Sequence, residues 1–576
     1  MNGTRRSAWT WLWVWLGAFF AFAAVAHGNF ESTDAGFTMH AARALWKRGD
    51  SALLSTDQGG ELLGERLGAE HIAREKINGR IGTNGRAYVW YPMGHVWLMV
   101  PFVAAGECLQ QSFPGAEAAF RATVAPAVPD AALWSSPSYL YGHPVLMQGL
   151  IALLVPSMFA ATSVLLLYFV ARALAVSSRD AALATGSIVL GTQFFALGRE
   201  TLSDGPGLCC LLGALLATVR VHLGTAARSL PLVGGMAAGA SVLLRYQNAF
   251  LVVVCGLAIA LACRRRKHWD ELGGFLVGGL PFACLFFGVN VARFGHPLIT
   301  GYPEATTWFD QPIWIGLCKL LLSAGRGILW LSPVLWLALP LAVGRRHTPQ
   351  LRWLAWVLFA IPMLMFATAR GWQGGQCWGA RYVTPGIVVL LVLVLPQARP
   401  WVKWPRTFML LCLAGTFANV TSVVTPTRGL IQLASQAVRA EAQHEVAALR
   451  MTEAERQAIA AEPEDVASWR PRFSPLHANW SYAWRSFPGG FEDERGAPRN
   501  GSANTIEPLF GVVAAEPVQG DAPQRWEDRG GRHLWWRFWG HLLAVPEWAL
   551  VGPVALLAVL LSVLGWRRLL AASSQS

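Results

Sequence analysis

Apolar runs long enough to cross a membrane recur along the chain and are separated mostly by short polar connections. Runs of about 17–25 apolar residues match the thickness of a hydrocarbon core. Twelve such runs are centred near residues 18, 158, 189, 213, 238, 256, 281, 335, 361, 389, 415 and 557. The pattern predicts an all-α polytopic membrane protein with about twelve transmembrane helices.

Two long polar segments interrupt this pattern, at about residues 28–143 and 426–545. Residues 91–107 of the first are apolar, and we expect a helix lying at the membrane surface, because another span would reverse the side of every later loop. In the second, residues 430–461 have a helical pattern with a capping box at Thr452-Glu453-Ala454-Glu455, and the rest predicts a small irregular cap. We expect a membrane module over 1–425 that includes loop 28–143, an extracytoplasmic segment over 426–545, and a final helix and tail over 546–576.

Charge predicts which side of the membrane each loop occupies. The 576-residue chain has a mean hydropathy of +0.37 and a net charge of +13, and its basic residues gather at the ends of apolar runs. The positive-inside rule makes these ends cytoplasmic, together with both termini, and places both long segments outside. The sites are Arg172 and Arg179, Arg220 and Arg228, Arg264 to Lys267, Arg345 to Arg352, Lys403 to Arg406, and Arg567 with Arg568. Because these basic residues lie at the ends of the predicted spans, they argue against nucleic-acid binding.

Two features of the chain leave alternatives open. Arg5 and Arg6 precede an apolar run that ends near Ala26, which predicts an uncleaved first helix, with a cleaved signal peptide as the alternative. The nine cysteines show no CxxC pair, and only Cys108 and Cys377 are expected outside the helices on the outer side. A disulfide between them is possible but does not follow from the sequence.

Candidate chemistry begins just outside the first span. Glu31 and Asp34 precede a helix-like stretch, where a carboxylate is favoured by the helix dipole, although Asp34 could simply be an N-cap. Arg199 and Asp204 lie in a short outer hairpin, where they either serve function or pair with each other. Arg245 lies between two spans and suits phosphate recognition or snorkelling to lipid head groups.

Two further outer segments combine basic, aromatic and glycine residues. Phe294-Gly-His-Pro-Leu-Ile-Thr-Gly-Tyr302 precedes a helix with Lys319 that ends in the Gly-Arg-Gly turn at Arg326. Small residues there would let backbone approach a ligand, although an ordinary turn would look the same. A Trp- and Gly-rich segment ends in Arg381-Tyr382, which suits sugar and phosphate contact or a plain interfacial loop. Because all five segments are predicted on one side, they favour a joint site.

These segments, in this order, resemble the GT-C superfamily of integral-membrane glycosyltransferases. The likeness is to bacterial members related to protein O-mannosyltransferases and to the aminoarabinose transferase of lipid A. It is carried by Asp34, Tyr91-Pro-Met-Gly, Asp204, the Phe294–Tyr302 segment, Ser-Ala-Gly-Arg-Gly-Ile-Leu-Trp-Leu-Ser-Pro around Arg326, and Trp-Gly-Ala-Arg-Tyr around Arg381. It spans roughly residues 8–400 and implies a multi-pass protein of the bacterial plasma (inner) membrane with an extracytoplasmic active face.

The resemblance implies inverting transfer of a sugar from a polyprenyl-phosphate donor to a lipid, glycan or protein acceptor, with Asp34 as base. Arg245, Arg326, Arg381 and Lys319 are then candidates for the donor phosphate, and Glu31, Asp204, Arg199, Tyr302 and Tyr91 for supporting roles. Tyr91-Pro-Met-Gly stands where related enzymes often have Lys-Pro-Pro-Leu or His-Pro-Pro-Leu, so a phosphate-binding cation is missing there.

The sequence holds no Walker A motif, no strand followed by GxGxxG, and no HExxH, so we expect a membrane-embedded donor, no cofactor and no metal. Two other functions remain open. A secondary transporter commonly has twelve spans, but it would place ionisable residues mid-membrane within repeated halves, which are not visible here. A non-catalytic protein of envelope-polysaccharide assembly could retain the fold without the chemistry.

Overall fold

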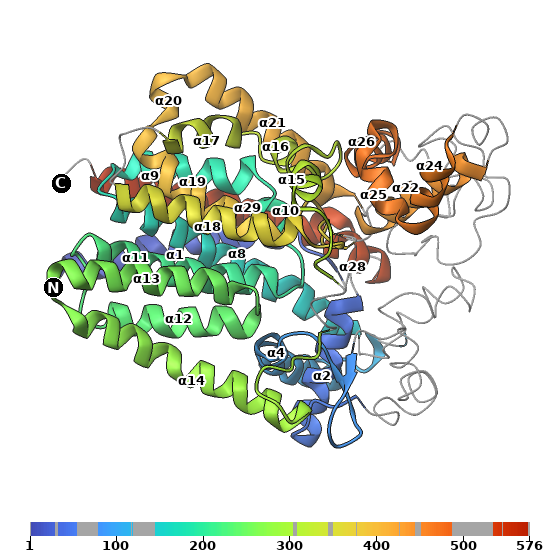
Figure 1. Ribbon diagram of the computed structural model, residues 1–576, viewed down its shortest axis with the longest axis horizontal. Coiled ribbons are helices and arrows are strands. Elements are labelled where there is room, and N and C mark those ends of the chain that lie inside the picture. The colour runs from blue at the N-terminus through green and yellow to red at the C-terminus, as the bar shows by residue number, and fades with distance from the viewer. Residues whose placement is uncertain are drawn as a thin grey trace.

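The computed structural model describes residues 2–28, 33–53, 79–116, 118, 145–302, 308–343, 349–375, 377–425, 427–443, 451–486, 534–543 and 545–573. These residues are almost entirely helical (Figure 1). The strands described are β1 (Gly79–Ile81) and β2 (Ala87–Val89), which pair antiparallel with Gly79 opposite Val89. The predicted fold class, an all-α polytopic membrane protein, is confirmed.

Eight helices of the described residues contain a stretch long and apolar enough to cross a membrane. They are α8 (Val145–Ala173), α11 (Asp204–His222), α13 (Asn248–Arg266), α14 (Trp269–Phe294), α18 (Pro349–Ala367), α19 (Thr384–Ala398, with η3 at Arg381–Val383 before it), α21 (Pro405–Val424) and α29 (Glu547–Ser573). Three shorter apolar stretches lie in α1 (Asn2–Ala24), α12 (Leu230–Leu244) and α15 (Ile313–Leu322).

Each of the twelve predicted centres falls within a helix. Among these helices α9 (Ser178–Gly191) has 14 residues, α12 has 15 and α17 (Leu335–Val343) has 9, all fewer than a full span needs. Three short helices lie next to the spans along the chain: α10 (Phe194–Leu197) follows α9, α16 (Ile328–Leu331) precedes α17, and α20 (Pro400–Lys403) lies between α19 and α21. The apolar pattern therefore located the helices correctly, while their lengths depend on turns that hydropathy does not resolve.

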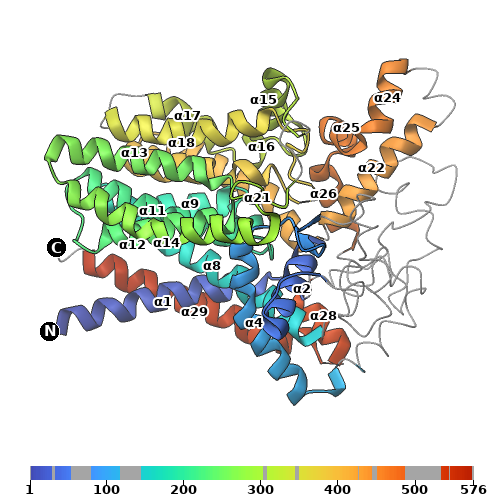
Figure 2. The same ribbon diagram turned by 60° about the horizontal axis from the view of Figure 1, so that its bottom comes forward.

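Burial differs sharply around the bundle. The span that includes α19 is 89% buried and apolar on every face, whereas that of α14 is only 11% buried and runs along one edge (Figure 1). A helix with apolar residues all round can lie at the centre of a bundle, and an exposed apolar helix faces lipid. The N-terminal α1 packs along the C-terminal α29 and against α8 (Figure 2). Gly17 permits this close approach, because a Cβ there would lie 2.5 Å from the Ser562 hydroxyl.

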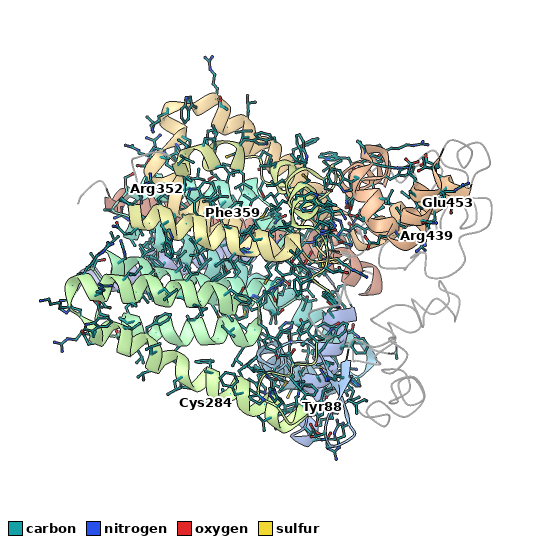
Figure 3. All side chains as sticks on the ribbon, viewed as in Figure 1. Tyr88, Cys284, Arg352, Phe359, Arg439 and Glu453 are labelled. Carbon is teal, nitrogen blue, oxygen red and sulfur yellow. The ribbon has the colours of Figure 1, made fainter. Side chains whose placement is uncertain are left out.

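The described parts of both long polar segments lie at the end of the bundle opposite the two termini, which we call the distal end (Figures 1 and 2). It carries α2 (Thr33–Arg48), α4 (Met93–Ser112) and the sheet, and also α22 (Thr427–Gln443), α24 (Glu453–Ala461), α25 (Pro463–Trp469), η4 (Pro471–Phe473) and α26 (Pro475–Ser486). In Figure 3, Arg352 lies at the terminal end, and Arg439 and Glu453 lie at the distal end. The described parts of both segments therefore share one end of the bundle, and the assignment of that end to the extracytoplasmic side stays a prediction.

The helix predicted over 91–107 is α4, which packs on α2 at the distal end (Figure 2). Within the pattern predicted over 430–461, the described residues include helices α22 and α24, and the capping box at Thr452 and Glu455 is present. Helices α22, α24, α25, η4 and α26 pack together around Leu430, Val438 and Phe473, and we call them the cap. A separate helix, α28 (Trp535–Leu543), lies beside α29. Cys108 lies within α4, not outside the helices as predicted, and no disulfide joins it to Cys377 in the described structure.

Candidate active site

Asp34 lies in the first turn of α2 at the distal end of the bundle. The Tyr91 hydroxyl, just before α4, donates to Asp34 Oδ1 at 2.7 Å. This contact forms because α2 packs along α4. The Asp34 side chain keeps 28% of its surface exposed, so its carboxylate can still reach a ligand.

Asp204 lies at the first residue of α11, where the helix dipole favours a negative charge. Its carboxylate forms an ion pair with Arg245 at the end of α12, and both side chains are 5% exposed. Arg381 joins the two acidic residues, with Nη1 3.5 Å from Asp204 Oδ2 and Nη2 3.7 Å from Asp34 Oδ2. Two carboxylates and two guanidinium groups therefore form one cluster, as buried charges near a bilayer require partners.

The Tyr382 ring contacts both arginines of this cluster. The guanidinium carbons of Arg245 and Arg381 each lie 5.1 Å from the centre of its ring. Phe366 stacks against the same ring, with 4.5 Å between centroids. The negative face of an aromatic ring attracts cations, so Tyr382 helps to hold both guanidinium groups in the cluster.

An aromatic wall borders the cluster. Trp90 stacks on Tyr302 with ring planes 7° apart and centroids 5.8 Å apart. Tyr246 meets Tyr302 edge-on, and Trp308 meets Trp90 edge-on. Burial raises the pKa of Tyr302, as does nearby Tyr382, while Arg245 acts in the opposite direction. The Tyr302 phenol is therefore a neutral hydroxyl beside the charged cluster.

The loop before Arg381 needs glycine where it folds back on that side chain. Gly374 has a φ of +77°, and a Cβ there would lie 2.7 Å from Arg381 Cγ. Gln193, between α9 and α10, donates to the Ala380 carbonyl at 3.3 Å and to Thr384 Oγ1 at 2.6 Å. The approach of Arg381 to the cluster is thus fixed by contacts on both sides of the residue.

Residues 144–289 match the family described as dolichyl-phosphate-mannose-protein mannosyltransferase. The match runs from α8 into α14 and includes Asp204 and Arg245. The resemblance to the GT-C superfamily of membrane glycosyltransferases is confirmed. No curated protein matches this chain significantly in sequence.

Two solved structures are similar to this GT-C-like chain. ArnT from Cupriavidus metallidurans bound to undecaprenyl phosphate aligns over 83% of this chain and 80% of its own, with 14% identity and a TM-score of 0.43. The apo state of the same protein aligns over 83% and 74%, with 14% identity and a TM-score of 0.44.

The alternatives weighed for Asp204 and Arg245 are wrong. Arg199 does not pair with Asp204; it is buried and donates to the Val423 carbonyl. Arg245 does not extend to head groups, since it is buried against Asp204. Glu31, the other carboxylate predicted near Asp34, lies outside the described residues.

Two basic residues predicted for the donor phosphate are bound to protein groups instead. Arg326 is fully buried, and its Nη1 donates to the Gln373 carbonyl at 3.1 Å and the Gly375 carbonyl at 2.6 Å. Lys319 donates to Gln311 at 2.7 Å and pairs with Asp465 of the cap at 2.6 Å. The small residues around Arg326 admit the chain's own backbone, so the assignment of these two side chains to phosphate is corrected.

Sequence reasoning did not assign a role to four residues near the cluster. Tyr382, Trp90 and Tyr246 each neighbour a predicted residue in the chain, which is the signal that could have found them. Glu200 is buried, and its charge acts on Arg381. No group of three or more His, Cys, Asp or Glu side chains that could hold a metal occurs within the part of the chain that the structure describes.

Proposed function

We propose that this protein transfers a sugar from a polyprenyl-phosphate donor to an extracytoplasmic acceptor, with inversion at the anomeric carbon and Asp34 as the general base. The observation that carries the proposal is the cluster of Asp34, Asp204, Arg245 and Arg381 at the distal end. The family match over 144–289 supports glycosyl transfer as the reaction class.

Asp34 has the geometry of a base. The Tyr91 hydroxyl donates to Oδ1 of Asp34. Among the ion pairs of the described residues, Oδ2 of Asp34 makes one long contact, 3.7 Å to Arg381 Nη2. A general base needs a lone pair within hydrogen-bond reach of the proton that it removes. Oδ2 retains that capacity, and it belongs to the most exposed carboxylate of the cluster.

Arg381 is the cation best placed for the leaving group. It shares its charge between two carboxylates at 3.5 and 3.7 Å, so neither contact is a tight pair. The acceptor hydroxyl attacks the anomeric carbon, its proton passes to Asp34, and the bond from that carbon to the phosphate oxygen breaks. The lipid phosphate leaves with the bonding electrons, and a guanidinium stabilises that charge. Arg245 is bound to Asp204 and positions the cluster.

The aromatic wall is suited to the sugar. Trp90 and Tyr302 are half-buried and stack parallel beside the charged cluster. Flat aromatic faces contact the apolar face of a pyranose, and the neutral Tyr302 hydroxyl can donate to a sugar oxygen. The family matched over residues 144–289 is described by a dolichyl-phosphate-linked mannose, and this supports a lipid-phosphate-linked sugar as the donor.

The first prediction concerns a variant in which the proposed base, Asp34, is replaced. Asp34→Asn should lower kcat by about 10²–10⁴-fold, because the amide cannot accept the hydroxyl proton. The measurement is sugar transfer from a panel of polyprenyl-phosphate sugars by purified protein in lipid vesicles. The matched control is Asp310→Asn, which removes an exposed carboxylate paired with Arg370. Turnover by Asp34→Asn equal to that of the control would remove Asp34 from the role of base.

A further inference from the structure

One side chain of the cap uses both carboxylate oxygens to hold the membrane module. Asp465 of α25 accepts from the Trp372 indole at 2.9 Å through Oδ1 and pairs with Lys319 at 2.6 Å through Oδ2. The side chains of Asp465 and Lys319 are 13% and 12% exposed, and Trp372 is fully buried. A buried indole N–H without an acceptor costs free energy, so the hydrogen bond from Trp372 fixes the position of the Asp465 carboxylate.

The backbone of the same helix binds a second segment. The Ser468 carbonyl accepts from the Ser323 hydroxyl and from the Gly325 amide, each at 3.0 Å. A Cβ on Gly325 would lie 2.4 Å from Pro475 Cδ, so the turn and the cap are in direct contact. The cap therefore holds the turn that carries Arg326.

Both attachments converge on the loop that leads to Arg381. Trp372 belongs to that loop, and Arg326 donates to the carbonyls of Gln373 and Gly375 within it. Gly374, between those two carbonyls, folds against the Arg381 side chain. A continuous series of contacts thus runs from Asp465 to the guanidinium beside Asp34.

We propose that the cap sets the position of Arg381, and that Asp465 is a positioning residue for sugar transfer. The effect on turnover rests on the proposed function, whereas the effect on the loop does not. Misplacing a reacting or charge-stabilising group by about 1 Å can cost 10²-fold in rate. A cap that holds the loop from 371 to 380 would prevent that displacement, and it gives the C-terminal segment a role in the reaction.

The experiment compares Asp465→Ala with Glu453→Ala in the full-length protein. Glu453 is an exposed cap carboxylate paired with Arg456, so its removal tests charge loss alone. Hydrogen exchange of the amides in 371–380 is measured first, because it needs no activity. We expect exchange at least tenfold faster in Asp465→Ala, with no change in Glu453→Ala and none in α19 of either variant.

Turnover is then measured in a double-mutant cycle with Arg381→Lys. Asp465→Ala should lower kcat about tenfold in the native background and less than twofold when Arg381 is already lysine, because both changes act through one group. Asp465→Asn, which keeps an acceptor for Trp372, should recover part of the loss. Unchanged exchange in 371–380 would overturn the proposal, and so would independent, multiplying effects on kcat. Faster exchange in a protein that transfers no sugar would uphold the cap contact and overturn only the proposed function.

Discussion

Two charged clusters at the distal end are built from similar residues but differ in how completely their central carboxylate is used. Asp465 has both oxygens in short contacts, with Trp372 and Lys319. Asp34 has one oxygen bound to Tyr91, while the other lies 3.7 Å from Arg381. Asp465 thus resembles a structural anchor, and Asp34 keeps a lone pair for chemistry. The two carboxylates thus differ in exposure and in how many of their oxygen atoms are held in short contacts.

The largest effect should come from breaking the pair that supports the Asp34 cluster. Asp204→Leu leaves Arg245 buried without its ion-pair partner, which should lower the free energy of unfolding by about 3–5 kcal/mol. Asp465→Leu should cost less, about 1–3 kcal/mol, because Lys319 is partly exposed and can turn to water. Denaturant titration in mixed micelles measures both values.

The matched control for Asp204 removes both charges at once. Asp204→Leu combined with Arg245→Met should restore most of the stability, since apolar side chains can replace a buried ion pair at little cost. If the double variant is as unstable as Asp204→Leu, the loss comes from packing. If Asp465→Leu costs as much as Asp204→Leu, the contrast in burial between the clusters does not govern their stability.

The sequence predicted the helices because the length of an apolar run is a local signal. It also predicted that Asp34, Asp204, Arg245 and Arg381 share one end of the bundle, where they form one cluster. It did not predict which residues pair, because pairing depends on how separate loops meet in space. Gly-Arg-Gly around Arg326 shows the difficulty: small residues would suit a bound ligand, yet here they admit Pro475 of the cap. Lys319 was misassigned for the same reason, since its partner Asp465 lies far along the chain.

A smaller change tests whether the Asp34 cluster acts on rate without loosening the backbone. Tyr91→Phe removes the hydrogen bond that orients Oδ1, and kcat should fall roughly tenfold, equivalent to about 1.4 kcal/mol of barrier. Stability should change little, because the partly exposed carboxylate of Asp34 can bind water instead. Tyr88→Phe is the control, since its hydroxyl contacts Asn84. Equal turnover in these two variants would mean that Tyr91 does not orient the base.

A change of pH should also distinguish the two regions. Burial lowers the pKa of His40 and of His95 to about 3, with Arg43 and Arg48 adding to the effect at His40. These imidazoles are neutral in folded α2 and α4, whereas the unfolded chain takes up their protons below about pH 6.5. The stability that each contributes is therefore complete above pH 6.5 and is lost towards pH 3, by about 1.4 kcal/mol per pH unit.

The described cap helices contain one histidine, the exposed His477, so the cap should not share this response. Hydrogen exchange between pH 7 and pH 5, corrected for the intrinsic pH dependence of exchange, should show α4 losing protection while α22 does not. His95→Leu should remove part of the loss in α4, because no proton is then taken up at that position on unfolding. Equal loss in α4 and α22 would mean that acid acts on the whole distal end through its net charge, and the two clusters would then not be energetically separate.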